Sequence, residues 1–385
     1  MRFIHGGIFW IKNRITSRQF LLLSSVFVGI SAALAVILLK TFAHQVYLFA
    51  SDLNKRVHFQ YVNFILPVIG IVLTVFIVKR VLKGNLEKGT WRIIYAITKR
   101  SSILPRAQMY AQIITSSITV GFGGSAGLES PVTITGAAFG SNYARQYRLS
   151  AKERTLLLAC GVAAGIAAAF NAPIAGVLFT MEVLLADVGI SAFIPLMLSA
   201  ATGALVSTVI LNDKILLSLK GQLAFDYFNI PWYILLGILT GFIAVYHSRM
   251  FVRIEGFFER LNWGKYQKAI FGALLLSLLI LLFPCLFGEG YESMKVLSTK
   301  HPENMLDNSL FSSIPRQDML LLLFVGVVVF LKSIATGITL GSGGNGGNFA
   351  PSLFVGSYTG FAFAYGLNLT GWFDKIPVTN FTMVG

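Results

Sequence analysis

Long stretches of apolar residues without a charged side chain dominate the sequence. Eight such windows reach about 20 residues or more, and they cover 19–39, 57–78, 107–128, 155–181, 188–212, 227–248, 269–288 and 333–373. Because about 20 apolar residues in a helix cross the hydrocarbon core of a bilayer, the pattern predicts an all-α polytopic membrane protein. It argues against a soluble enzyme, a membrane β-barrel and a disordered chain.

The positive charge of the chain is concentrated in a few segments. The formal net charge is +15, and most of the 31 Lys and Arg residues lie in 1–18, 79–106, 145–154 and 249–268. Cytoplasmic loops of membrane proteins carry an excess of Lys and Arg, so we expect these four segments in the cytoplasm, including the basic N-terminus 1–18. The charge therefore indicates topology, and we expect no nucleic-acid partner.

The order of windows and basic segments does not fit simple helix counting. Three long windows lie between 145–154 and 249–268, and an odd number of crossings would leave the chain on the wrong side. We therefore expect a broken or re-entrant helix, with the break at Asn171-Ala172-Pro173. Non-helical backbone at membrane depth is tolerated only where it is buried in protein or lines a watery cavity, so such a break indicates a transport path.

Two glycine-rich clusters share one template. Residues 123–131 read Gly-Gly-Ser-Ala-Gly-Leu-Glu-Ser-Pro, and residues 343–351 read Gly-Gly-Asn-Gly-Gly-Asn-Phe-Ala-Pro, at an offset of 220 residues. Corresponding Gly/Pro-interrupted segments in two halves indicate a midplane site in a repeat-built transporter. We expect a transmembrane domain over 19–385, with repeats at about 60–212 and 227–385 and the second repeat incomplete at the C-terminus.

Each cluster predicts a helix that begins inside the membrane. A Gly-rich turn leads to Pro131 in one and to Pro351 in the other, and proline favours the first turn of a helix. A helix N-terminus carries unpaired N–H groups and the positive end of the dipole. Two converging N-termini could offset much of the cost of dehydrating an anion. The clusters therefore predict an anion pathway; the alternative is close Gly-rich packing with incidental prolines.

Glu129 is the only charged residue between Arg106 and Arg145. A carboxylate within the membrane is costly and is by default a functional hypothesis. In that hypothesis it occupies the site of the permeant anion and must swing out or take a proton before an anion passes. The alternative is a static cap, because a carboxylate also stabilises a helix N-terminus.

Other candidate sites are weaker. Glu182 follows the predicted break and is a candidate acid at the cytoplasmic approach, although a helix-end carboxylate paired with a base is the favoured interpretation. Residues 341–346 match G-x-G-x-x-G but lack the strand and the acid of a dinucleotide site. The five histidines are scattered. We therefore expect no metal and no cofactor.

The motifs resemble those of the chloride channel and transporter (CLC) family. Residues 123–131 resemble its GxExP motif, 347–351 resemble its GxFxP motif, and 163–179 follow the region between them. The resemblance implies a homodimer of inverted-repeat subunits in the bilayer, each with its own pathway and with Glu129 as the gating glutamate. It also implies that anions meet main-chain N–H groups of Gly127, Leu128, Glu129, Ser130, Asn348, Phe349 and Ala350.

Three departures from the family pattern bear on mechanism. The serine-bearing GSGIP motif is not recognisable, and the best register places Lys88-Gly89-Thr90-Trp91 there. Exchangers of the family usually carry a proton-transfer glutamate one position after Glu182, where this chain has Val183, as channels do. The sequence ends at Gly385, before the family's last helices, so we expect either a fragment or an incomplete second repeat.

We therefore expect a passive chloride channel of the CLC type, gated by Glu129, and not an enzyme. One alternative is a proton-coupled chloride or fluoride exchanger of the same family, in which Glu129 carries protons. A more remote alternative is a carrier of organic anions, which would need a fixed base at depth; Lys332 is the only basic residue in 319–373. The chain suits a prokaryotic plasma membrane.

Overall fold

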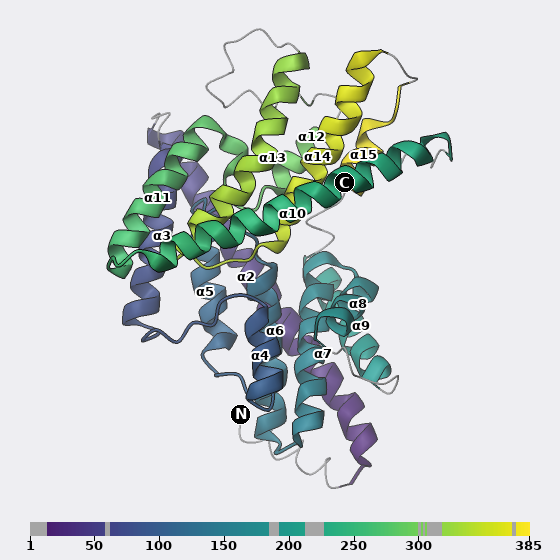
Figure 1. The fold of residues 1–385 in the computed structure, drawn as a ribbon. Helices are drawn as coiled ribbons and strands as arrows, with labels where there is room; N and C mark the ends of the chain where they lie inside the picture. The colour runs from purple at the N-terminus through teal and green to yellow at the C-terminus, as the bar shows by residue number, and fades with distance from the viewer. Residues whose placement is uncertain are drawn as a thin grey trace. The chain divides into compact units, whose positions relative to one another are not determined.

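The computed structural model describes residues 14–57, 62–184, 192–211, 227–298, 302, 305, 318–371 and 375–385. Within these ranges the chain is almost entirely helical (Figure 1). Of the predicted basic N-terminus, only the part from Arg14 onwards lies among the described residues. The helices are α2 (Ser17–Val57), α3 (Val62–Arg80), α4 (Trp91–Lys99), α5 (Gln108–Gly121), α6 (Glu129–Gln146), α7 (Ala151–Phe170), α8 (Pro173–Leu184), α9 (Phe193–Leu211), η2 (Tyr227–Asn229), α10 (Ile230–Arg260), α11 (Lys265–Leu282), η3 (Pro284–Leu286), α12 (Tyr291–Leu297), α13 (Asp318–Gly341), α14 (Phe349–Thr370) and α15 (Val378–Val384).

Several of these helices are long and apolar enough to cross a membrane. Among the described residues six qualify, namely Ser17–Asp52, Ala151–Phe170, Phe193–Leu211, Tyr227–Arg260, Lys265–Leu282 and Asp318–Gly341. The predicted class, an all-helical membrane protein that crosses the bilayer several times, is confirmed.

The helices form two compact units that interleave along the sequence. Unit 1 comprises Met1–Ala43, Arg80–Ser117 and Glu129–Leu216, and unit 2 comprises His44–Lys79, Ile118–Leu128 and Leu217–Gly385. Long α2 therefore contributes its first part to unit 1 and its last part to unit 2. The division of the domain into repeats at about 60–212 and 227–385 stays a prediction.

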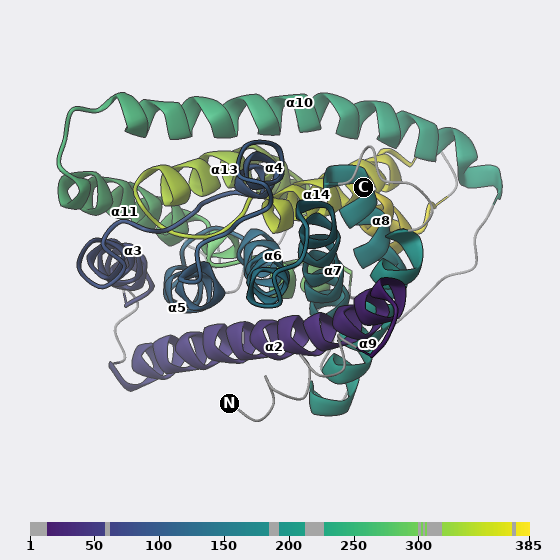
Figure 2. The same cartoon turned by 90° about the horizontal axis from the view of Figure 1, so that it is seen from below.

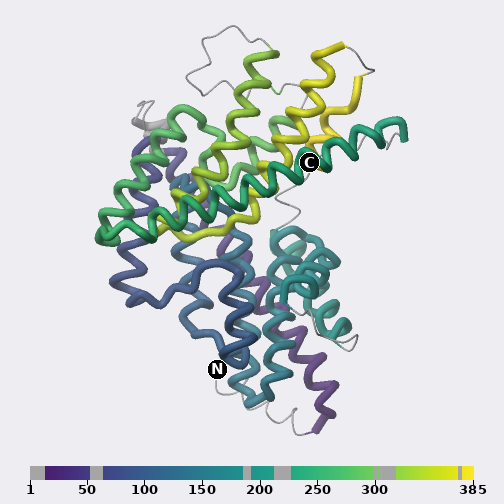
Figure 3. Tube along the Cα trace, in the orientation of Figure 1, coloured from purple at the N-terminus to yellow at the C-terminus, as the bar shows by residue number. Residues whose placement is uncertain are grey.

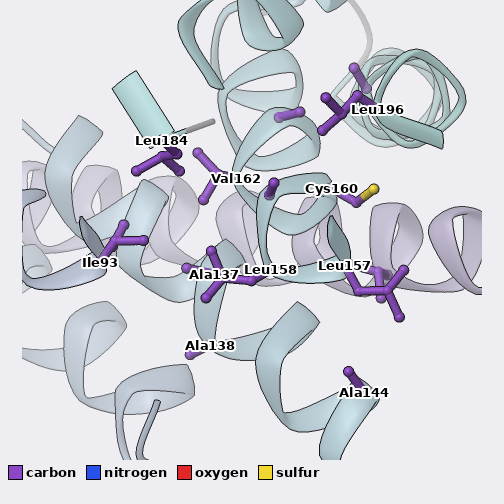
Figure 4. Close-up of a cluster of buried hydrophobic side chains, with 14 of the residues drawn as sticks. Ile93, Ala137, Ala138, Ala144, Leu157, Leu158, Cys160, Val162, Leu184 and Leu196 are labelled. Carbon is purple, nitrogen blue, oxygen red and sulfur yellow. The ribbon is translucent and has the colours of Figure 1, made fainter. Parts of the chain in front are cut away.

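The core of unit 1 depends on a close crossing of α6 and α7. A Cβ atom added to Gly136 would lie 2.2 Å from the carbonyl oxygen of Gly161, and one added to Gly161 would lie 2.0 Å from that of Gly136. Small residues at both positions let the two backbones touch. Around the crossing lies a cluster of buried Ala, Leu, Ile and Val side chains, among them Ala137, Leu158 and Val162 (Figure 4).

The basic segments of unit 1 gather at one end. The ring of Phe20, in the first turn of α2, lies 6.1 Å from that of Tyr147, which follows α6. Arg154, near the start of α7, donates a hydrogen bond to the carbonyl oxygen of Ser101 at 2.8 Å. Parts of the basic segments 79–106 and 145–154 therefore lie beside the start of α2, as expected if all three face the same side of a membrane.

Unit 2 is built around α13. Figure 2 shows the long helix α10 running along α13 and α14, and the three helices pack against one another. At the end of α3, Lys79 lies over the ring of Tyr266, near the start of α11, at 4.8 Å from the ring centroid. This contact joins Lys79, the first residue of the basic segment 79–106, to the basic segment 249–268 within the unit.

The predicted helix break is present. Helix α7 ends at Phe170, Asn171 adopts the left-handed conformation, and α8 begins at Pro173. Figure 3 draws α7 and α8 in teal along the Cα trace. The last carbonyl groups of a helix need partners outside it. Ser207 donates to the carbonyl oxygen of Ala168 at 2.8 Å, and the ammonium group of Lys40 donates to that of Ala169. A cation at a helix C-terminus also complements the dipole.

The glycine crossing yields the first prediction. We expect Gly161→Ala to destabilise the protein by about 1–3 kcal/mol, because the new methyl group would overlap main-chain atoms of α6 that cannot rotate away. Thermal unfolding in detergent measures the effect. Gly241→Ala in α10 is the matched control, because an added Cβ there meets nothing within 4 Å. An equal shift in both variants would contradict the packing argument.

Candidate functional site

The two glycine-rich clusters form two loops that link helix ends in the same way. The first loop (122–128) follows α5 and precedes α6, which begins at Glu129. The second loop (342–348) follows α13 and precedes α14, which begins at Phe349. Both helices start two residues before the motif proline, as the sequence predicted. The 220-residue offset of the template therefore holds for the helix ends as well.

The loops pair with each other inside unit 2. Gly127 and Gly347 exchange both main-chain hydrogen bonds at 2.8 Å, the two residues forming an antiparallel bridge. Gly123 and Gly343 occupy equivalent positions and have φ values of +96° and +122°. Residues with a Cβ are strained at such angles, so both positions require glycine.

Two threonine hydroxyls cross between the loops. The N–H of Asn345 in the second loop donates to the hydroxyl of Thr119 at the end of α5, at 3.0 Å. In return, the N–H of Ser125 in the first loop donates to the hydroxyl of Thr339 at the end of α13, at 3.1 Å. All four residues are buried. The pairing obeys the same 220-residue offset, so it is a two-fold exchange between equivalent parts of the chain.

The residues predicted to bind an anion fall in both units. Gly127 and Leu128 lie in unit 2, as do the second-motif residues. Glu129 and Ser130 are the first residues of α6 and belong to unit 1, where they are 7% and 6% exposed. The second-motif residues at the start of α14 are Asn348, Phe349 and Ala350.

The start of α14 is held by a buried histidine. His247 of α10 lies 2.9 Å through Nε2 from the side-chain oxygen of Asn348, and 2.7 Å through Nδ1 from the hydroxyl of Ser333 on α13. Nothing in the sequence connects these residues, because 86 and 101 positions separate His247 from its partners. His247 therefore fixes the side chain of Asn348, the residue directly before α14, next to the bridge between the loops.

An acidic residue lies against the first loop. Glu289 accepts a hydrogen bond from the N–H of Leu128 through Oε1, at 3.1 Å. Lys332 of α13 is completely buried, and its ammonium group donates to the carbonyl oxygen of Gly288 at 3.1 Å. Neither residue was predicted as part of the site. In the sequence, Glu289 is the acidic residue that directly follows the apolar window 269–288, and Lys332 is the single basic residue within 319–373. These two features could have indicated both residues.

Glu182, the candidate acid at the cytoplasmic approach, and Val183, at the position of the family's proton-transfer glutamate, lie at the end of α8. Glu182 is exposed, and its neighbour Val183 packs against the apolar core of unit 1. Near the start of α4, Gly89 has a φ of +79° and Thr90 directly precedes the helix. The segment Lys88-Gly89-Thr90-Trp91 therefore also leads into a helix N-terminus.

The crossed threonines yield the second prediction. We expect Thr119→Val to destabilise the protein by about 1–3 kcal/mol, because it leaves the buried N–H of Asn345 without this acceptor. Thr339→Val should cost a similar amount, since it removes the equivalent acceptor. Thermal unfolding in detergent compares both with Thr119→Ser and Thr339→Ser, which keep the hydroxyl. A valine variant as stable as its serine control would contradict the proposed role of the crossed bonds.

Comparisons with known proteins agree with this geometry. The family model described as voltage gated chloride channel matches residues 69–385. The voltage-gated ClC-type chloride channel ClcB of Escherichia coli (strain SMS-3-5 / SECEC) is 29% identical over 261 residues, which are 68% of this chain and 57% of that protein. The chain thus spans little more than half the length of this relative.

Solved structures show the same fold. A slow cyanobacterial Cl⁻/H⁺ antiporter superposes with a TM-score of 0.76 and 21% identity, covering 92% of this chain and 81% of the other. A CLC-type fluoride/proton antiporter superposes with a TM-score of 0.73 and 22% identity, covering 96% and 86%. With a family model that matches most of its length, the chain belongs to the voltage-gated chloride channel (CLC) family.

Proposed function

We propose that this chain conducts chloride across a membrane, with main-chain N–H groups at the two motifs as anion ligands and Glu129 as the gate. The observation that carries the proposal is the crossed pairing of the two Gly-rich loops, which places non-helical backbone where two helices begin. A transporter needs such backbone at depth, whereas a helical scaffold does not.

The charges at the two helix starts support an anionic ligand. The first turn of α14 contains no acidic residue, so the positive end of its dipole is not offset by a side chain of its own first turn. At the equivalent place in the template, α6 begins with Glu129, a buried carboxylate. The N-terminus of α6 thus carries the carboxylate of Glu129, whereas the equivalent position of α14 carries the uncharged side chain of Phe349. A carboxylate that imitates the ligand at one of two equivalent positions is suited to act as a gate.

We favour a passive channel over a proton-coupled exchanger because of Val183. A valine packed against an apolar core offers no group that takes up a proton at the position where exchangers of the family usually carry a glutamate. The relative in Escherichia coli bears the name of a channel. Exchange of chloride or fluoride for protons is the second candidate, favoured by the antiporters that share the fold.

The orientation and assembly follow from the same proposal. The basic segments that meet in each unit support a cytoplasmic N-terminus, by the positive-inside rule. The bacterial relative supports a prokaryotic plasma membrane.

For assembly we propose a homodimer, as in the family. Apolar side chains exposed on α8 and α9, such as Ile174, Leu178 and Leu205, suit contact with lipid or with a second subunit.

Flux measurements test the proposal. In proteoliposomes loaded with chloride, we expect the wild type to release chloride without moving protons. Glu129→Gln should release it about tenfold faster at neutral pH, because the neutral amide competes less well with chloride for the N–H groups; such a change corresponds to about 1.4 kcal/mol. Glu182→Gln is the matched control, because it removes an exposed carboxylate of the same unit and should leave the flux unchanged.

Simultaneous recording of pH separates the two candidates. Uphill proton movement driven by a chloride gradient, and abolished by Glu129→Gln, would establish exchange and overturn the channel mechanism. A folded wild-type protein that releases no chloride would contradict the proposed function in both forms. Equal effects of Glu129→Gln and Glu182→Gln would contradict the gating role of Glu129.

A further inference from the structure

The segment that carries Glu289 is fixed against the first loop and against helix α14. Gly288 and Gly290, on either side of the glutamate, have φ values of +64° and +92°. The N–H of Gly288 donates to the carbonyl oxygen of Gly123 in the first loop at 3.3 Å. A Cβ added to Gly290 would lie 2.4 Å from the ring of Phe354 on α14. The main chain on both sides of Glu289 is therefore held in place, and its carboxylate has a defined direction.

That direction is towards the first motif. Oε1 of Glu289 accepts from the N–H of Leu128 at 3.1 Å, and Leu128 lies directly between Gly127 of the bridge and Glu129. A hydrogen bond from an amide to an ionised carboxylate is the kind of contact that the amide would make with a free anion. The carboxylate thus fills a position that an anion bound at this amide would occupy.

A buried base balances this carboxylate. Lys332 is 0% exposed, donates to the carbonyl oxygen of Gly288 and lies over the ring of Phe354 at 4.7 Å from its centroid. It also interacts electrostatically with Glu289. An ionised side chain within a membrane protein is costly without an opposite charge nearby, and such pairs mark functional paths. Lys332 therefore holds its ammonium group on the main chain next to Glu289, where it can act as a counter-charge to the carboxylate.

We propose that Glu289 is an internal anion that competes with chloride for the N–H of Leu128, and that Lys332 is the positioning residue that supplies its counter-charge. The proposal rests on the proposed function, since it takes the first motif as part of the anion pathway. It adds a second carboxylate to that pathway, on a different segment from Glu129. Chloride affinity is then set by the balance between this pair and the entering ion.

A purely structural role would have a different signature. If Glu289 only fastened its segment to the first loop, Glu289→Gln would keep an oxygen that accepts from the N–H of Leu128 and would leave chloride binding unchanged. If it competes as an anion, the neutral amide is a poorer competitor and leaves the charge of Lys332 uncompensated. The charge, and not the hydrogen bond alone, then determines the affinity.

Calorimetric titration of the folded, purified chain with chloride tests the proposal. We expect Glu289→Gln to bind chloride about tenfold more tightly than the wild type, a change of about 1.4 kcal/mol. Glu292→Gln is the matched control, because Glu292 lies three positions away, is 82% exposed and pairs with Lys295 at 3.0 Å. The chloride affinity of Glu292→Gln should stay within about twofold of that of the wild type, well below the tenfold increase expected for Glu289→Gln.

The opposite substitution strengthens the test. Lys332→Gln should weaken chloride binding, because it leaves the negative charge of Glu289 without its partner, and Glu289→Gln in that background should restore it. General destabilisation would weaken binding in both single variants. If Glu289→Gln does not elute as a folded protein, Glu289→Asp is measured in its place, because the shortened side chain reaches the N–H of Leu128 less well. Tighter chloride binding by Glu289→Asp supports the proposal, and unchanged binding overturns it.

The outcomes separate this inference from the proposed function. A wild-type protein that neither binds nor releases chloride contradicts the anion pathway itself. A wild-type protein that binds chloride, with an unchanged affinity in the folded Glu289→Gln variant, overturns the role of Glu289 and leaves the pathway intact. Equal tightening by Glu289→Gln and Glu292→Gln would also overturn it, because a general surface-charge effect would then explain the result.

Discussion

Two threonine hydroxyls, each accepting an N–H from the opposite Gly-rich loop, hold the centre of unit 2 together. The loops interrupt helices in a chain that spans a membrane, and hydrocarbon offers no partner for main-chain N–H groups. The Gly127–Gly347 bridge and the crossed bonds of Thr119 and Thr339 give several of these N–H groups a hydrogen-bond acceptor inside the protein. The glycines with positive φ and the closeness of the two loops both depend on this exchange.

The charged side chains near the two loops can all be interpreted by their relation to an anion. Helix N-termini and exposed loop amides favour anions, and the protein supplies its own at Glu129 and at Glu289. A completely buried lysine balances the second carboxylate from α13. His247 fixes Asn348 on the other side of the bridge. In this account, permeation is a competition between a mobile anion and these two carboxylates.

The sequence predicted those parts of the fold that depend on short-range patterns. Most of the apolar windows coincide with spanning helices, although 107–128 and 333–373 also contain the two loops. Asn171-Ala172-Pro173 predicted the break after α7, and the shared template predicted both loops and their helix starts. It could not predict contacts made across 161 to 226 positions, such as those of Glu289 with Leu128 and of Asn345 with Thr119. Nothing local marks a threonine as an acceptor for a distant loop, or a lone lysine as a counter-charge, until the helices that carry them are packed.

The central claim is that main-chain N–H groups of the two motifs bind an anion. Anomalous diffraction from crystals of this chain grown with bromide in place of chloride tests it most directly, because bromide is a heavy halide with the same charge. The account predicts a bromide peak within hydrogen-bond distance of main-chain nitrogens among Asn348, Phe349 and Ala350. It also predicts a stronger peak at Leu128 in Glu289→Gln than in the wild type. Bromide sites confined to surface lysines and arginines, with none at either loop, would contradict it.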